Sequence, residues 1–132
     1  LGEAGGQVAL LSYGRITKAC VRAAEYLKIK GVPSFAVNCS TLKPLDEGLL
    51  FQMAAQGIRF VTVEEGILSG GFGEGILAFC STHHLPPPLL HIGIEDRFIP
   101  QGTVPYLLRR CGLSAQSIAL RILEALHLEW EG

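Results

Sequence analysis

A short strand that runs into a glycine-rich bend is encoded by residues 62–75, which read TVEEGILSGGFGEG. The β-branched and aromatic run from Phe60 to Val63 predicts the strand. Apolar residues beyond the glycines fall at helical spacing, so the glycines are expected to turn the chain from strand to helix. The segment therefore predicts a strand–bend–helix unit in which the strand delivers Glu64 and Glu65 into the bend.

The glycines of this bend do not match a phosphate-binding loop. A dinucleotide fingerprint requires G-x-G-x-x-G, but Gly75 follows Gly73 one position too early, and no Gly-Lys-Ser/Thr follows. Glu64, Glu65 and Glu74 also bring negative charge to the place that a phosphate would occupy. We expect the glycines to allow positive φ and close packing, one glutamate of the pair to cap backbone amides and the other to meet a basic partner. An acid/base role for the pair is the alternative.

Composition and charge indicate one well-packed domain. The 132 residues are 48% hydrophobic and 17% charged, which is typical of a globular protein with a real core. The formal net charge is -1 and the basic residues form no block, so we expect no nucleic-acid partner. No apolar run approaches transmembrane length, so we expect no membrane partner either. Residues 1–6 resemble a linker and residues 7–132 one domain; since the first residue is Leu1, we expect a piece of a longer chain.

Four widely spaced cysteines, with no C-x-x-C motif, are expected to be reduced core residues: Cys20, Cys39, Cys80 and Cys111. The first residues have neither the basic nor the apolar region of a signal peptide. The cytoplasm is therefore the expected compartment.

Strand and helix patterns alternate along the chain. Continuous or β-branched apolar runs predict strands at residues 8–11, 34–39, 60–63 and 89–94. Helical periodicity, with Asp46 as a candidate N-cap, predicts helices after each of the first three strands and a last helix starting at Ser114, with a short helix from Thr103 to Gly112 before it. This alternation predicts an α/β domain with a parallel sheet covered on both faces by right-handed crossovers.

Isolated histidines and serines give no catalytic motif. His83 and His84 are adjacent, which is not a metal-ligand spacing, so we expect a surface loop. His91 lies in an apolar strand and is expected to be a hydrogen-bonded core residue, and His127 complements a helix dipole. Ser69 is not part of a G-x-S-x-G motif.

One loop after the fourth predicted strand gathers polar groups. Residues 93–102 hold Asp96 and Arg97 beside apolar residues that must be buried. Asp96 with Arg97 form a candidate site, and a loop that satisfies its own polar groups is the alternative.

The order and intervals of several motifs resemble the C-terminal domain of the 1-deoxy-D-xylulose-5-phosphate synthases. These motifs are KPLDE at residues 43–47, TVEE at 62–65, GGFG at 70–73, IGI at 92–94 followed by Asp96, and FIPQG at 98–102. The Pro-Leu-Asp, paired-glutamate and Gly-Gly-x-Gly motifs are shared with transketolases and with β subunits of 2-oxoacid dehydrogenases. The loop from Asp96 to Gly102 favours the synthases, although Glu95 stands where many relatives carry proline.

The resemblance implies a fold, a reaction and a setting. The fold is a three-layer α/β/α sandwich with a mostly parallel sheet of four to five strands. The full-length enzyme is a homodimeric transferase that condenses pyruvate with glyceraldehyde 3-phosphate, releasing carbon dioxide, with thiamine diphosphate and magnesium. Its product feeds isoprenoid, thiamine and pyridoxal biosynthesis in the bacterial cytoplasm or in plastids.

The resemblance also implies that this domain holds no catalytic, cofactor-binding or metal-binding residue. Neither Asp46 nor Asp96 lies between glycines as the family's metal–diphosphate motif requires, and the glutamate that activates the cofactor belongs to another domain. The domain is expected to support the dimer and the neighbouring domains through structural or interface residues: Pro44, Asp46, Glu64, Glu65, Gly70, Gly71, Gly73, Asp96 and Gly102.

Two alternatives stay open. One is the corresponding part of a transketolase or of a dehydrogenase β subunit. The other is a free-standing domain that binds a small ligand in the crevice at the strand ends, where Glu65, Ser69 and Asp96 would converge.

Overall fold

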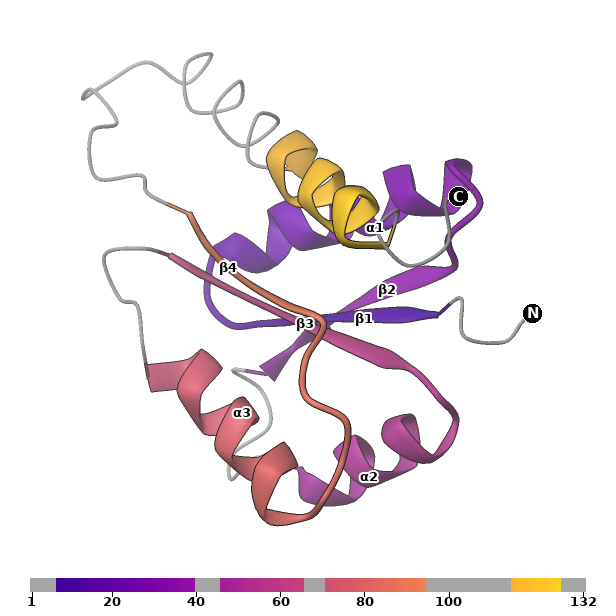
Figure 1. Ribbon diagram of the computed structural model, residues 1–132. Helices are drawn as coiled ribbons and strands as arrows, with labels where there is room; N and C mark the ends of the chain where they lie inside the picture. Colours follow the sequence, from indigo (N-terminus) through magenta and orange to yellow (C-terminus); the bar gives the residue numbers. More distant parts are fainter. Residues whose placement is uncertain (1–6, 40–45, 66–70, 95–114, 127–132) are drawn as a thin grey trace.

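Among the residues that the structure describes, four parallel strands form one sheet in the order β2-β1-β3-β4 (Figure 1). The computed structural model of the protein describes residues 7–39, 46–65, 71–94 and 115–126. The strands are β1 (Val8–Ser12), β2 (Ser34–Asn38), β3 (Arg59–Glu65) and β4 (Leu90–Ile94). The helices are α1 (Ile16–Ile29), α2 (Glu47–Ala55), α3 (Gly71–Thr82) and a C-terminal helix over residues 115–126.

The register brings the carboxyl ends of the strands to one edge of the sheet. Ser12 of β1 pairs with Asn38 of β2 and with Val63 of β3, and Glu64 of β3 pairs with Gly93 of β4. The chain moves outward from β1 to β2 and then crosses back to β3 on the other side of β1. The carboxyl ends of β1 and β3 therefore flank a topological switch point, where open α/β sheets commonly bind ligands.

Helices cover both faces of the sheet and give two apolar cores (Figure 1). On one face α1 and the C-terminal helix pack on alternate strand residues, such as Leu10 and Val63. On the other face α2 and α3 pack on the intervening residues, such as Leu11 and Phe60. This alternation follows from the two-residue period of a strand, and β1 is buried on both sides because it lies inside the sheet. The prediction of a three-layer α/β sandwich with a parallel sheet is confirmed.

The predicted elements of the described residues are confirmed with small shifts. All five residues predicted for the inner face of α1 are buried: Ile16, Ala19, Cys20, Ala23 and Leu27. Asp46 caps α2, because its Oδ1 accepts a hydrogen bond from the Leu49 nitrogen at 3.1 Å. The third strand is longer than predicted and extends through Glu65. The last helix buries Ile118, Ala119, Ile122 and Leu126 as expected, and Leu123 is half-buried.

Several predictions concern residues outside the described ranges: the linker at 1–6, Pro44, Ser69, Gly70, Asp96, Arg97, Gly102, the short helix from Thr103, Cys111 and His127. Within the described ranges, no helix has both the length and the apolar character needed to cross a membrane.

Candidate functional site

Glu64 and Glu65 lie at the carboxyl end of β3 and point to opposite faces of the sheet. Successive strand residues alternate in direction, so Glu64 contacts the start of α3 while Glu65 contacts the start of α1. Both residues are buried, with relative exposures of 1% and 8%. Carboxylates are rarely this buried unless they are paired, so their partners decide what this corner of the sheet can do.

Glu64 is the centre of a polar cluster that joins β3, α3 and β4. Its Oε2 accepts a hydrogen bond from the Gly73 nitrogen at 3.1 Å and lies 3.2 Å from Nε2 of His91. Nδ1 of His91 lies 2.7 Å from the Thr62 hydroxyl. The other carboxylate oxygen, Oε1, is buried and has no hydrogen-bond partner among the described residues. The cluster fixes the first turn of α3 on the strand ends.

Gly73 is needed for this cluster because a side chain would not fit. A Cβ at Gly73 would lie 2.5 Å from Cε1 and Nδ1 of His91 and 3.1 Å from Oε2 of Glu64. Real Cβ atoms are not found that close to other heavy atoms, so a larger residue would push the imidazole off Glu64 and Thr62. The prediction that the glycines permit close packing is thereby confirmed at Gly73. Among the described residues, positive φ is found at glycines outside the bend: Gly14, Gly31 and Gly57.

His91 differs from the sequence-based prediction. It is hydrogen-bonded as expected, but its side chain is 44% exposed, so the prediction of a core histidine was wrong. The reason is its place on β4, the last strand of the described sheet, where one side of the residue has no neighbouring described strand. Both ring nitrogens lie near a polar group of the protein, Nδ1 near the Thr62 hydroxyl and Nε2 near the Glu64 carboxylate.

Glu65 forms an ion pair with Arg15, the residue that precedes α1. Nε of Arg15 lies 2.6 Å from Oε2 of Glu65, and the arginine side chain is 73% exposed. A cation at the start of a helix opposes the helix dipole, and the carboxylate offsets that cost. Two contacts tie the same loop down: the Ser12 and Thr17 hydroxyl oxygens are 2.9 Å apart, and the Tyr13 and Phe72 ring centroids are 5.2 Å apart.

The positive end of α3 is occupied by a carboxylate of the protein itself. Because Glu64 already accepts the Gly73 amide, a phosphate at this helix start would face an anion. This agrees with the prediction from spacing and charge that no phosphate binds here. The expected contacts of the glutamate pair are both present, since Glu64 caps an amide and Glu65 meets a cation. Ser69 and Asp96 lie outside the described residues, so a ligand crevice shared by them with Glu65 stays a prediction.

Neither the histidines nor the cysteines form a metal site in the part of the chain that the structure describes. There, no group of three or more His, Cys, Asp or Glu side chains could hold a metal ion. His83 and His84 are exposed, as predicted, and His83 packs against Phe51 and Phe79 with centroid distances of 5.0 Å and 4.6 Å.

The three cysteines in the described part of the chain are free, buried thiols, as predicted: Cys20, Cys39 and Cys80. Burial raises the pKa of the Cys20 thiol to about 11, and a hydrogen bond with Ser12 opposes the rise. Burial also raises the pKa values of Cys39 and Cys80. Thiols that resist ionisation are poor nucleophiles, so these residues serve the core.

The sequence did not reveal which partners the glutamates have. The alternation of strand residues places Thr62 and Glu64 on one face of the sheet, and this could be read from the sequence. That His91 is their partner depends on the register between β3 and β4, which the sequence did not reveal. Arg15 is 50 residues from Glu65 in the chain and became its partner only because β1 and β3 are neighbours.

The family model described as the transketolase C-terminal domain matches residues 1–118. The chain belongs to this family. Among known proteins, the 1-deoxy-D-xylulose-5-phosphate synthase of Listeria welshimeri is 39% identical over 118 residues, and that of Parabacteroides distasonis is 37% identical over 118 residues. Each match covers 89% of this chain and 19% of the relative. The synthase of Caldanaerobacter subterraneus is 38% identical over 120 residues.

A solved structure shares the fold of this transketolase C-terminal domain. It is described as a split gene transketolase, inactive β4 tetramer, and it matches with a TM-score of 0.68 and 29% identity. The match covers 97% of this chain and 41% of the other. The chain therefore spans about a fifth of the length of the synthases it matches and less than half of the transketolase chain.

Proposed function

We propose that this chain is the C-terminal domain of a 1-deoxy-D-xylulose-5-phosphate synthase and that it serves domain packing and dimer assembly. The observation that supports this role is that Glu64 and Glu65 are both buried and make their contacts within the domain. Glu64 contacts Gly73 and His91, and Glu65 contacts Arg15. Both carboxylates are thus buried and take part in contacts within the domain, which favours a structural role. The names of the relatives support the parent reaction, in which pyruvate and glyceraldehyde 3-phosphate give 1-deoxyxylulose 5-phosphate and carbon dioxide.

Thiamine diphosphate, with magnesium, supplies the carbanion chemistry of such a reaction when it is bound. The described residues do not fit this cofactor, because they form no metal-ligand group and because Glu64 places a negative charge at the start of α3. We therefore assign the cofactor and the chemistry to other domains of the full-length homodimer. A bacterial cytoplasm or a plastid is the proposed location.

Deletion tests the proposed role of the domain. In the full-length protein, removal of residues 7–132 is expected to abolish synthase activity and to convert dimers to monomers, as measured by product formation and by light scattering. Full activity and an intact dimer without these residues would refute the role.

Substitution of the glutamates separates a structural from a chemical function. Glu64→Gln in the full-length enzyme is expected to lower the melting temperature while kcat, measured well below that temperature, changes less than about threefold. An acid/base role predicts the opposite result, a loss of two or more orders of magnitude in kcat at unchanged stability.

A transketolase is the second candidate, because the matching solved structure carries that name. The two are told apart by the donor substrate of the full-length enzyme. A synthase consumes pyruvate and releases carbon dioxide, whereas a transketolase transfers a two-carbon unit between sugar phosphates and releases no carbon dioxide.

A further inference from the structure

The outer side of α1 carries large apolar side chains that the domain leaves exposed. Ile29 is 80% exposed, and Val21 and Tyr26 are 44% and 38% exposed. The buried residues of α1 lie on its other side and pack in the core that also holds strand residues and the C-terminal helix. Single exposed apolar residues are common, but three on the outer side of one helix indicate a surface that something else contacts.

The same side carries cations that have no carboxylate partner among the described residues. Lys18, Arg22, Glu25 and Ile29 follow one another at intervals of four, three and four, so they form one row along the helix, with Lys28 beside it. Lys18, Arg22 and Lys28 are exposed, and no ion pair joins them to a described carboxylate. We call these five residues the outer face of α1; three cations against one carboxylate make it basic.

A groove lies at the end of this face, where α1 leads into β2. It has a volume of about 350 Å³ and is lined by Gln7, Lys28, Gly31, Pro33, Ser34 and Phe35. Phe35 is 37% exposed, and its strand, β2, lies at one end of the described sheet order. An aromatic ring beside an unpaired lysine suits an apolar side chain that is flanked by a carboxylate.

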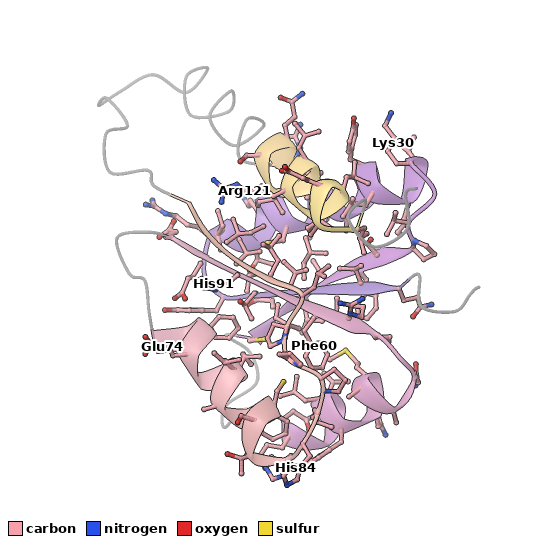
Figure 2. The ribbon with its side chains drawn as sticks, in the orientation of Figure 1. Lys30, Phe60, Glu74, His84, His91 and Arg121 are labelled. Atoms are coloured by element: carbon pink, nitrogen blue, oxygen red, sulfur yellow. The ribbon has the colours of Figure 1, made fainter. Side chains whose placement is uncertain are left out.

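Cations and carboxylates lie on opposite sides of the domain, although the formal net charge is only -1. Neither α2 nor α3 contains lysine or arginine, while Glu47 and Glu74 are acidic. Figure 2 shows the labelled Lys30 and Arg121 with the layer of α1 and the C-terminal helix, and Glu74 on α3. The side that α1 forms is therefore the basic one, and it complements an acidic partner.

A protein surface fits the outer face of α1 better than a lipid surface does. A membrane-bound amphipathic helix buries its apolar side in lipid, but the core already uses the apolar side of α1. Phosphates, of a lipid or of a nucleic acid, would also meet the carboxylate of Glu25 within the row. A protein can place carboxylates opposite the cations and an apolar side chain against Ile29.

We propose that the outer face of α1 and the groove beside Phe35 dock an acidic surface of another domain of the full-length protein. This rests on the proposed function and names the surface that the domain packing uses. The occupant is chosen because the face is basic and because the chain covers only 19% of its synthase relatives, so that most of such a protein lies outside it. Carboxylates of that domain pair with Lys28 and Arg22, and one of its apolar side chains fills the groove.

Thiol labelling of the full-length protein tests whether the face is covered. Ile29→Cys lies in the face, and Gln52→Cys is the matched control, exposed on α2. The expected result is that a bulky maleimide modifies Ile29→Cys at least tenfold more slowly than Gln52→Cys, with equal rates after unfolding, once the unsubstituted protein's rate is subtracted. Equal rates in the native protein would overturn the proposal.

Charge reversal tests whether the partner is acidic. In the full-length protein that carries Ile29→Cys, the pair Arg22→Glu and Lys28→Glu is expected to raise the labelling rate at least tenfold, because like charges then face each other. Gln52→Glu, which adds negative charge to the opposite helix layer, should leave the rate unchanged. Labelling that stays slow after both cations are reversed would refute an acidic partner.

Vesicles of phosphatidylglycerol and phosphatidylcholine test the lipid alternative. The full-length protein is expected to remain in the supernatant when these vesicles are sedimented. Sedimentation with the vesicles that Lys28→Glu abolishes would assign the face to a lipid surface and overturn the proposal.

These results are independent of catalysis. A full-length protein that lacks synthase activity but protects Ile29→Cys would contradict the proposed function and leave the docking face standing. An active synthase with a freely labelled Ile29→Cys would do the reverse.

Discussion

Oε2 of Glu64 lies 3.1 Å from the backbone nitrogen of Gly73, so a buried strand carboxylate caps the helix that follows it. The first amides of a helix have no partners within the helix, and an anion at this end also complements the helix dipole. Nε2 of His91, on the neighbouring strand, lies 3.2 Å from the same oxygen. Three elements therefore meet at one atom, and the strand–bend–helix corner is held from outside the helix.

Substitution of Gly73 should break this corner. In the 132-residue chain, Gly73→Ala is expected to destabilise the fold by about 1–2 kcal/mol, because the new methyl group displaces His91 and the lost hydrogen bonds outweigh the gain in helix propensity. Chemical denaturation measures the change. Gly75→Ala on the same helix is the control and should stabilise this chain by up to about 1 kcal/mol, since its Cβ meets nothing within 4 Å. Similar effects of the two substitutions would contradict the role of Gly73.

The Arg15–Glu65 pair should contribute little, and in a salt-dependent way. A double-mutant cycle of Arg15→Gln and Glu65→Gln is expected to give a coupling of about 0.5–1 kcal/mol, because the arginine is 73% exposed. The cycle is required since Arg15 makes a further contact that the single substitution also removes. The coupling energy should shrink in 1 M salt, because the screening length falls to about 3 Å at that ionic strength. A coupling energy that salt leaves unchanged would mean that the ion pair is much less accessible to solvent than the structure shows.

Ionisation of Cys20 should destabilise the protein at alkaline pH. Burial raises the pKa of this thiol from 9.0 to about 11. Between these two pH values the thiol is largely ionised in the unfolded chain but still protonated in the folded protein. Stability is therefore full below pH 9 and falls as the pH rises to 11, by about 3 kcal/mol for the two-unit difference. Urea titrations between pH 8 and 11 measure this fall. Cys20→Ala should make the decline shallower, and an identical decline in that variant would assign it to other groups.

The C-terminal helix should be an integral part of the core. Ile122 is fully buried in the cluster that includes β1 and β3, so Ile122→Ala is expected to cost about 2–5 kcal/mol. Leu120 is on the same helix but 57% exposed, and Leu120→Ala should cost less than about 1 kcal/mol. Thermal and urea unfolding of the two variants give the comparison. Comparable losses would mean that this helix does not pack as the structure shows.

Local sequence patterns predicted most of the architecture. The continuous apolar run of β1, the periodic inner face of α1 and the cap at Asp46 depend on residues close in the chain, and they were predicted correctly. The charge and spacing around the glycine bend also excluded a phosphate loop, because both can be counted along the sequence.

The exposure of His91 and the partners of the glutamates could not be predicted in this way. An apolar run around His91 indicates a strand but does not say whether that strand lies inside the sheet or at the end of the described order. The choice between a core and a half-exposed histidine depends on strand order, which is a property of the whole fold.

The amino-acid sequence by itself determined that this protein is an α/β domain whose third strand carries two carboxylates into a glycine bend, since periodicity and turn chemistry act over a few residues. The tertiary structure decided what the carboxylates do. Register sets Glu64 against His91 and Gly73, and strand order sets Glu65 against Arg15, because contacts between distant segments exist only once the sheet has formed.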